Sequence, residues 1–313
     1  QAEVEAHVNT VNCVGVMGKG IALQFRQAYP DMFADYKRAC AAGEVVTGRM
    51  HVVATGLLSG AKWVINFPTK KHWRGKSKME FIDEGLVSLV DEVKKRNIKS
   101  VAVPPLGCGL GGLRWDDVRP RIESAFAALP DVRVLLYGPA GAPPPEDRVI
   151  RTKRPKMTPS RAVMMKALGA YKILDFKLSL LEIQKLAYFI QLAGQPLQLD
   201  FKKLHYGPYA HELQKVLRRF DGHFTRGFSG DSKPNVEIEV LQDAVDEADE
   251  VLASSPVEHD LVQRVVELIE GYETPYGMEL LASVHWLSTK ENAADLDDLL
   301  EGIAGWTARK GAQ

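Results

Sequence analysis

A glycine-rich stretch near the start of the chain has the composition of an anion-binding loop. Residues 9–20 read Asn-Thr-Val-Asn-Cys-Val-Gly-Val-Met-Gly-Lys-Gly and lead into the apolar periodicity of residues 21–25. Glycine lets the backbone turn sharply and approach a ligand, and a following helix offers unpaired N–H groups to an anion. We therefore predict a phosphate or diphosphate site. The spacing excludes a P-loop, because two residues separate Gly15 from Gly18 where that motif has four.

A second glycine-rich stretch, residues 107–112, follows a short apolar strand pattern at residues 101–103. It reads Gly-Cys-Gly-Leu-Gly-Gly and formally matches the G-x-G-x-x-G dinucleotide fingerprint. The next predicted helix begins near Asp116, away from the glycines, and no βαβ unit with a well-placed acidic residue follows. The pattern therefore does not indicate a Rossmann-type site.

Between the two glycine stretches lies a basic segment, residues 69–78, with six basic residues around one tryptophan. Cations suit DNA phosphates and an aromatic face suits a base, so the segment is typical of a contact with single-stranded DNA. A solvated basic run is the alternative, and a lone tryptophan is often a core residue. The residues predicted to contact DNA are Lys71, His72, Trp73 and Arg74.

Together these blocks resemble the macrodomain family, which binds ADP-ribose, and in particular the DNA ADP-ribosyl glycohydrolase antitoxins called DarG. The resemblance rests on residues 12–25, 65–73 and 104–113, which recur in that order. It implies that Asn12 hydrogen-bonds the distal ribose hydroxyls, with a turn asparagine that caps the loop as the alternative. The implied ADP-ribose-binding residues are Asn12, Gly15, Val16, Met17, Gly18, Lys19, Gly20, Gly107, Cys108, Gly109, Leu110, Gly111 and Gly112.

The resemblance also implies a catalytic residue, Lys70. The lysine that matches it in the resembling antitoxins is required to remove ADP-ribose from thymine in single-stranded DNA. Neither glycine stretch contains Asp or Glu, so these motifs do not supply the carboxylate pair of ordinary glycosidases. An ammonium could stabilise the charge that develops on the leaving thymine, whereas a desolvated amine could attack C1″ of the ribose. The sequence leaves both roles open, as well as a simple phosphate contact.

The elements that position these residues alternate between strand and helix patterns. This alternation predicts an α/β/α three-layer sandwich. The resemblance implies that it is a macrodomain with a central mixed sheet, over residues 1–138. In this family, the acidic residue that contacts adenine follows a strand that precedes the first strand predicted here. This sequence does not include that strand, so we assign no adenine contact. We expect strands at 6–9, 49–54, 61–67 (ending on Pro68), 101–103 and 132–137, and helices at 21–29, 32–42, 78–96 (capped by Ser77) and 116–128.

The remainder of the chain predicts a linker and a second domain. Residues 139–159 are rich in proline and glycine and then basic, which indicates a linker. Residues 160–313 have long helical periodicity and few strand signals, so we expect a mainly helical domain. Residues 180–189 and 203–209 resemble the Panacea-type antitoxin domain, which implies toxin binding. An unrelated helical bundle is the alternative.

Charge is distributed unevenly along a chain whose formal net charge is zero. Residues 235–313 carry four basic and eighteen acidic residues, a formal charge of −14, which the preceding residues balance. A basic N-terminal region suits a phosphate-rich substrate, and an acidic C-terminal region attracts a basic partner. The alternative is that the acidic residues only form solvent-exposed helix faces.

Length and composition bound the remaining possibilities. A chain of 313 residues suggests two domains. No apolar run approaches the ~20 residues that span a bilayer and residues 1–10 lack a signal-peptide pattern, so we expect a cytoplasmic protein without a membrane partner. The three cysteines, Cys13, Cys40 and Cys108, lack metal-ligand spacing, and no metal, cofactor or disulfide is expected. Cys108 has no base assigned beside it, so we expect it to pack the loop.

The resemblance to the DarG antitoxins implies the function. We expect an antitoxin that hydrolytically removes ADP-ribose from thymidine bases of single-stranded DNA and releases ADP-ribose as product. It would also bind the DarT-type ADP-ribosyltransferase toxin through its C-terminal domain. The alternative is a macrodomain that binds ADP-ribose without hydrolysing it and acts chiefly as a toxin-neutralising interaction protein.

Overall fold

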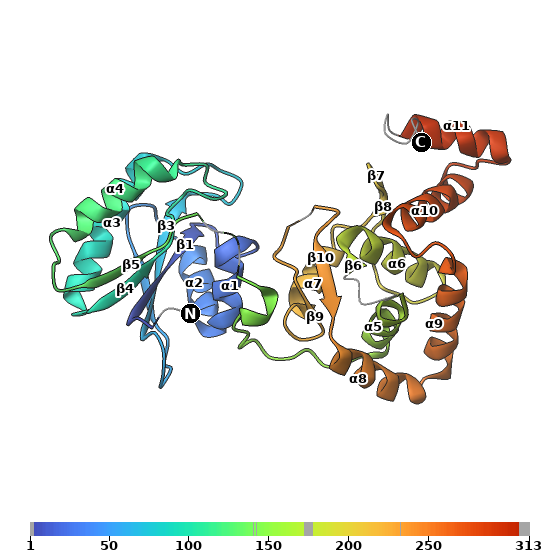
Figure 1. The fold of residues 1–313 in the computed structure, drawn as a ribbon, viewed down its shortest axis with the longest axis horizontal. Helices are drawn as coiled ribbons and strands as arrows, with labels where there is room; N and C mark the ends of the chain where they lie inside the picture. The colour runs from blue at the N-terminus through green and yellow to red at the C-terminus, as the bar shows by residue number, and fades with distance from the viewer. Residues whose placement is uncertain (1–2, 140, 142, 172–177, 232, 307–313) are drawn as a thin grey trace. The chain divides into compact units, whose positions relative to one another are not determined.

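The structure, a computed structural model, describes residues 3–139, 141, 143–171, 178–231 and 233–306 and divides into two compact units. The first unit covers residues 1–152 and the second covers residues 153–313 (Figure 1). The boundary between them falls inside the predicted linker.

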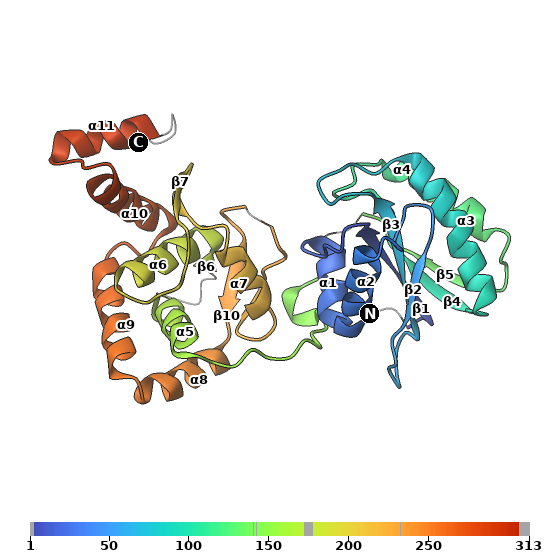
Figure 2. The same cartoon turned by 180° about the vertical axis from the view of Figure 1, so that it is seen from behind.

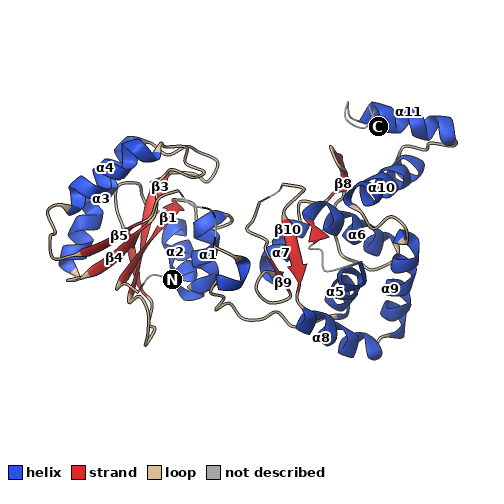
Figure 3. Ribbon diagram, in the orientation of Figure 1, coloured by secondary structure: helices blue, strands red, loops and turns tan. Residues whose placement is uncertain are grey.

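The first unit is built on a five-stranded mixed sheet with the strand order β2-β3-β1-β4-β5. Strand β1 pairs in parallel with β3 and β4, β4 pairs in parallel with β5, and β2 pairs antiparallel with β3. Helices α1 and α2 cover one face and α3 and α4 cover the other (Figure 3), so the predicted three-layer sandwich is confirmed. The elements are β1 (Ala6–Asn12), α1 (Gly20–Ala28), α2 (Pro30–Ala41), β2 (His51–Ala54), β3 (Trp63–Lys70), α3 (Met79–Lys95), β4 (Ser100–Val103), α4 (Trp115–Phe126), β5 (Arg133–Leu136) and the 3-10 helix η1 (Pro145–Asp147).

Alternating side chains of the central strands supply both layers of the core. Val8 and Phe67 pack with α3 and α4, whereas Val11 and Val64 pack with α1 and α2. Helix α3 approaches β3 closely at Gly85, where a Cβ would come within 2.2 Å of the Phe67 ring. This close packing fixes the strand that ends at Lys70.

Two local predictions about the basic segment are wrong. Strand β3 does not end on Pro68 but continues to Lys70, and the pairing of β1 with β3 shifts register beside the proline, between Val11 and Asn12. Proline is tolerated in a strand at such an irregularity. Ser77 is not the cap of α3, because the N-cap is Lys78 and no side chain makes a capping hydrogen bond.

The second unit is mainly helical, as predicted, and it also contains short strands. Helix α6 is its central element, with eleven of thirteen residues buried and contacts to α5, α9 and α10 (Figure 2). The elements are α5 (Pro159–Tyr171), β6 (Leu178–Ser179), α6 (Leu180–Leu192), β7 (Lys202–Leu204), β8 (Gly207–Tyr209), α7 (Leu213–Phe220), β9 (Thr225–Arg226), β10 (Glu237–Val240), α8 (Gln242–Ala253), α9 (Pro256–Ile269), α10 (Pro275–Lys290) and α11 (Leu296–Trp306).

Helix α6 is tied to the β7–β8 hairpin by buried polar groups. The ammonium of Lys185, which is 1% exposed, donates to the carbonyl of Pro208 at 2.7 Å. The Gln184 amide exchanges two hydrogen bonds with the backbone of Ala210, at 3.1 and 3.0 Å. The two sequence blocks that resemble the Panacea-type domain therefore contact each other directly.

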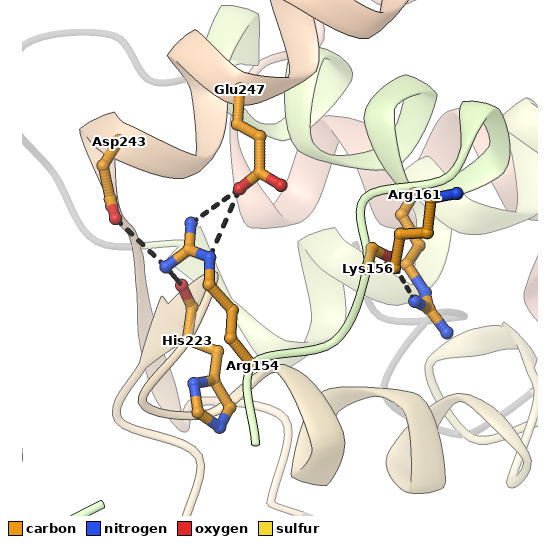
Figure 4. A network of polar contacts seen from close by, with 6 residues as sticks. All are labelled: Arg154, Lys156, Arg161, His223, Asp243 and Glu247. Atoms are coloured by element: carbon orange, nitrogen blue, oxygen red, sulfur yellow. Dashed lines mark hydrogen bonds and ion pairs between the residues drawn. The ribbon is translucent and has the colours of Figure 1, made fainter. Parts of the chain in front are cut away.

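The segment predicted as a linker is attached to each unit near the boundary. Arg151 donates its backbone N–H to Gln27 and its guanidinium to Ala28, both in α1. Beyond the boundary, Arg154 bonds Asp243 and Glu247 of α8 (Figure 4). Its guanidinium also lies over the Phe224 ring. No helix within the described ranges combines the length and apolarity that crossing a membrane requires.

Candidate functional site

The three sequence blocks meet at the edge of the sheet where β1, β3 and β4 end. Asn12 and Lys70, the last residues of β1 and β3, are register partners. The contact continues past the strands, because the Cys13 N–H donates to the Lys71 carbonyl at 3.1 Å. Loops at the carboxyl ends of neighbouring parallel strands form the usual ligand site of an α/β sheet.

The first glycine loop, residues 13–19, is shaped by Asn12. The Asn12 side-chain amide donates to the carbonyl of Val16 at 2.6 Å, and its oxygen accepts from the N–H groups of Val14 and Val16. The hydroxyl of Tyr36 in α2 donates to the Asn12 carbonyl at 2.6 Å. Asn12 thus holds the loop in place, in line with the alternative that it is a turn asparagine capping the loop. A hydrogen bond from Asn12 to the ribose stays a prediction.

Further contacts anchor the ends of the first glycine loop. Met17 is 1% exposed and packs into the core beside the amide of Asn9. Lys19 is the N-cap of α1, and Gly20 begins that helix with a φ of +56°. Anchored at Asn12 and Met17, the loop presents its glycines and the start of α1 at the sheet edge.

The second glycine loop, residues 107–112, is bonded to itself and to the basic segment. Leu113 donates to the Gly107 carbonyl and Ser77 donates to the Gly111 carbonyl, at 3.1 and 3.0 Å. Among the described residues, the backbone N–H groups of Gly109, Leu110 and Gly111 donate no hydrogen bond. Three neighbouring unpaired donors suit a diphosphate or ribose oxygen.

Lys70 connects the basic segment to the second glycine loop. Its half-buried ammonium lies 3.3 Å from the Leu110 carbonyl oxygen and 3.4 Å from the carbonyl oxygens of Trp73 and Gly75. Burial lowers the pKa of Lys70, and the nearby charge of Lys76 lowers it further. The structure thus places a partly desolvated cation where the basic segment meets the second glycine loop.

The aromatic group of the basic segment faces solvent. Trp73 is 45% exposed, so it is not a core residue. Its ring lies 5.4 Å from the His72 ring, and the Arg74 guanidinium carbon lies 4.5 Å from its centroid. Lys71 is exposed as well. An exposed ring flanked by cations suits a nucleobase, and the DNA contact of these four residues stays a prediction.

Cys108 fits the packing role expected of it. The thiol is half-buried against the core and lies 3.4 Å from the Leu106 carbonyl, and burial raises its pKa. A raised pKa keeps the sulfur protonated and a poor nucleophile.

Sequence reasoning missed the polar groups beneath the first glycine loop. Asn9, Asn66 and His51 lie side by side across β1, β3 and β2, with hydrogen bonds of 2.9 and 3.2 Å between them. The row ends at Asp35 of α2, and burial lowers the pKa of His51 although Asp35 opposes it. Asparagines inside otherwise apolar strands were the signal that could have revealed this row.

One groove lies apart from this edge. Helices α3 and α4 line it, and none of the predicted site residues does. Within the described residues, no three His, Cys, Asp or Glu side chains form a group that could hold a metal ion.

Comparisons with known proteins identify the family of this chain. The Macro domain family model matches residues 8–122. The DNA ADP-ribosyl glycohydrolase of Thermus aquaticus is 46% identical, covering 99% of this chain and 86% of that protein. The protein of the same name from Mycobacterium tuberculosis is 45% identical, covering 99% of this chain and 92% of that protein.

Two solved structures are similar to part of this chain. The macrodomain of Mycobacterium tuberculosis DarG is 60% identical and covers 45% of this chain and 92% of its own, with a TM-score of 0.45. The macrodomain of Thermus aquaticus DarG is 51% identical over 44% of this chain and 92% of its own, with a TM-score of 0.43. Given the two full-length relatives and the family model, this chain belongs to the DNA ADP-ribosyl glycohydrolase (DarG) family, and its first unit is a macrodomain.

Proposed function

We propose that the chain removes ADP-ribose from thymidine bases of single-stranded DNA, with the two glycine loops as the ADP-ribose site and Lys70 as the catalytic residue. Membership of the family supports hydrolysis at ADP-ribosylated DNA. The observation that carries the assignment of Lys70 is its contact with the Leu110 carbonyl. This contact joins the cation to a loop in which the N–H groups of residues 109–111 donate no hydrogen bond to the described residues.

Lys70 acts in this proposal as an ammonium and not as an attacking amine. Three carbonyl oxygens within 3.4 Å of Nζ match the three donors of an ammonium group. As the bond between C1″ and the thymine nitrogen breaks, its electron pair moves to the thymine, where the ammonium stabilises the charge or donates a proton. Water supplies the hydroxyl group to C1″, and its remaining proton goes to the thymine anion, or to Lys70 where that residue has protonated the thymine.

The basic segment holds the DNA strand next to this centre. Its residues 71–74 follow Lys70 directly in the chain, so a base on Trp73 and phosphates on Lys71 and Arg74 would flank the modified thymidine. The exposure of Trp73 and its stacking with its neighbours support this role.

A matched pair of substitutions tests the catalytic assignment. Lys70→Ala keeps both glycine loops, so it should bind free ADP-ribose within a few-fold of the wild type. Its release of ADP-ribose from a thymidine-modified oligonucleotide should fall by at least ~10²-fold, the scale of a positioned catalytic group. Lys71→Ala is the control and should keep the wild-type kcat at saturating oligonucleotide, because Lys71 is proposed to contact only a phosphate.

Two results would contradict this assignment. Equal losses in both variants, restored at low salt, would make Lys70 a phosphate contact. A wild-type protein that binds ADP-ribose but releases none from the oligonucleotide would instead be a macrodomain that only binds.

A second function is proposed for the second unit, namely binding and inhibition of a DarT-type transferase. The acidic composition of residues 235–313 supports a basic partner. At the junction of α9 and α10, Leu268, Tyr272 and Tyr276 are exposed beside the exposed acids Glu267 and Glu270. Exposed aromatic residues edged by charge are typical of protein interfaces.

Charge reversal at that junction tests the second function. In the full chain, Glu267→Lys with Glu270→Lys should weaken binding to the cognate transferase and reduce its salt dependence. The control reverses two exposed acids of the first unit, Glu123 and Asp131, and should leave binding unchanged. If the affinity for the transferase changes neither with salt nor in the junction variant, the acidic region is only a solvated face.

A further inference from the structure

A buried hydroxyl beneath the second glycine loop has no partner. Ser77 is 7% exposed, and its hydroxyl oxygen makes no hydrogen bond within the described part of the chain. The Ser77 N–H donates to the Gly111 carbonyl at 3.0 Å. A Cβ on Gly111 would lie 2.3 Å from both the Ser77 hydroxyl and the Gly107 carbonyl oxygen. The hydroxyl therefore lies directly against the inner side of the loop.

The same loop also has unpaired donors among its N–H groups. Those of Gly109, Leu110 and Gly111 donate no hydrogen bond in the described structure. Buried polar groups are normally paired, and an unpaired hydroxyl destabilises the conformation that contains it. Gly109 and Leu110 are exposed, so water satisfies their N–H groups, whereas Gly111 and the Ser77 hydroxyl are buried. These two buried donors indicate that the loop can reach a better-bonded arrangement.

Peptide geometry links these donors to the hydroxyl. The N–H of Gly111 shares a planar peptide unit with the carbonyl of Leu110, and the two groups point in opposite directions. When a ligand oxygen draws this N–H outward, the Leu110 carbonyl turns inward, where Ser77 lies. That carbonyl is the one that accepts from the Lys70 ammonium at 3.3 Å.

We propose that Ser77 is a positioning residue that takes the Leu110 carbonyl from Lys70 when ADP-ribose binds. The Ser77 hydroxyl then donates to Leu110, and one N–H of the Lys70 ammonium is released to face the leaving thymine. The proposal rests on the proposed ADP-ribose site and deepens it, because it couples occupation of the loop to the state of the catalytic cation.

Ser77→Ala tests this coupling through three measurements on the full chain. The melting temperature of the free protein should stay the same or rise, since the variant loses an unpaired buried hydroxyl. The Kd for ADP-ribose should rise about five- to tenfold, the equivalent of one hydrogen bond. The kcat for release of ADP-ribose from the modified oligonucleotide should fall at saturating substrate, because Lys70 stays bonded to Leu110.

Ser100→Ala is the matched control. Ser100 is 8% exposed, and its hydroxyl accepts from the Glu5 N–H at 2.9 Å. Loss of this paired hydroxyl should lower the melting temperature and leave Kd and kcat unchanged.

The outcomes separate this proposal from the function on which it rests. If Ser77→Ala melts lower and keeps the wild-type Kd and kcat, or if it changes none of the three, the hydroxyl is structural and the proposal is overturned. A wild-type protein that fails to bind ADP-ribose would overturn the proposed site itself.

Discussion

The positive charge of Lys76 opposes the positive charge of Lys70. After burial, it is the second cause that lowers the pKa of Lys70. Lys76 itself is exposed and extends over Gly112, where a Cβ would lie 3.3 Å from its Nζ. The two cations thus lie beside the second glycine loop.

Substitution of Lys76 should shift the pH dependence of turnover. If Lys70 acts as an ammonium, activity is present below its pKa and falls as the pH rises through it. Lys76→Ala removes a charge that lowers this pKa, so the alkaline limb of kcat should move to higher pH. An acidic limb that moves upward in Lys76→Ala, with less activity at neutral pH, would instead identify an attacking amine.

Two glycines of the second loop should respond differently to a methyl group. Gly111→Ala would place Cβ 2.3 Å from the Gly107 carbonyl, so the loop must shift, and we expect a loss of about 1–3 kcal/mol in stability with weakened ADP-ribose binding. Gly109→Ala is the control for stability, because nothing lies within 4 Å of its Cβ. Thermal unfolding and ADP-ribose titration measure both effects, and equal behaviour of the two variants would refute this packing argument.

Trp73→Ala should weaken DNA binding without weakening binding of free ADP-ribose. Stacking of a base on an aromatic ring contributes about 1–3 kcal/mol, so the KM for a modified oligonucleotide should rise roughly tenfold or more. Lys95→Ala, an exposed residue at the far end of α3, is the control. An unchanged KM for Trp73→Ala would remove the stacking role.

Lys185→Ala should destabilise the second unit and spare the first. It leaves the Pro208 carbonyl without its 2.7 Å donor and opens a cavity around a residue that is 1% exposed. We expect a loss of about 2–4 kcal/mol, seen in calorimetry as a melting transition that is about 5–15 °C lower. ADP-ribose binding should not change, and Lys202→Ala, on the exposed strand β7, should do nothing measurable.

Sequence periodicity predicted the layers of the first unit because its strands alternate between two buried faces and its helices have one apolar side. It did not predict where β3 ends. Pro68 is a common strand terminator, yet the register shift beside it lets pairing continue to Lys70. Ser77 shows the same limit, since its spacing to Glu80 matches a capping box while tertiary packing turns its side chain under the second glycine loop.

The sequence likewise predicted only part of the candidate site. Glycine spacing and the resemblance located both loops, but the bonds that shape them depend on contacts between distant residues, such as Tyr36 with Asn12 and Lys70 with Leu110. No local pattern encodes such pairs, because they depend on strand register and helix packing.

The hydrogen bonds of Arg154 determine at which residue the second unit should begin when it is expressed alone. Starting at residue 160, where helical periodicity begins, would delete a guanidinium that bonds Asp243, Glu247 and the His223 carbonyl. Two carboxylates of α8 would lose their common partner in a unit that is already acidic. Expression from Lys153 keeps these contacts of Arg154, and Lys153 is the boundary that the structure supports.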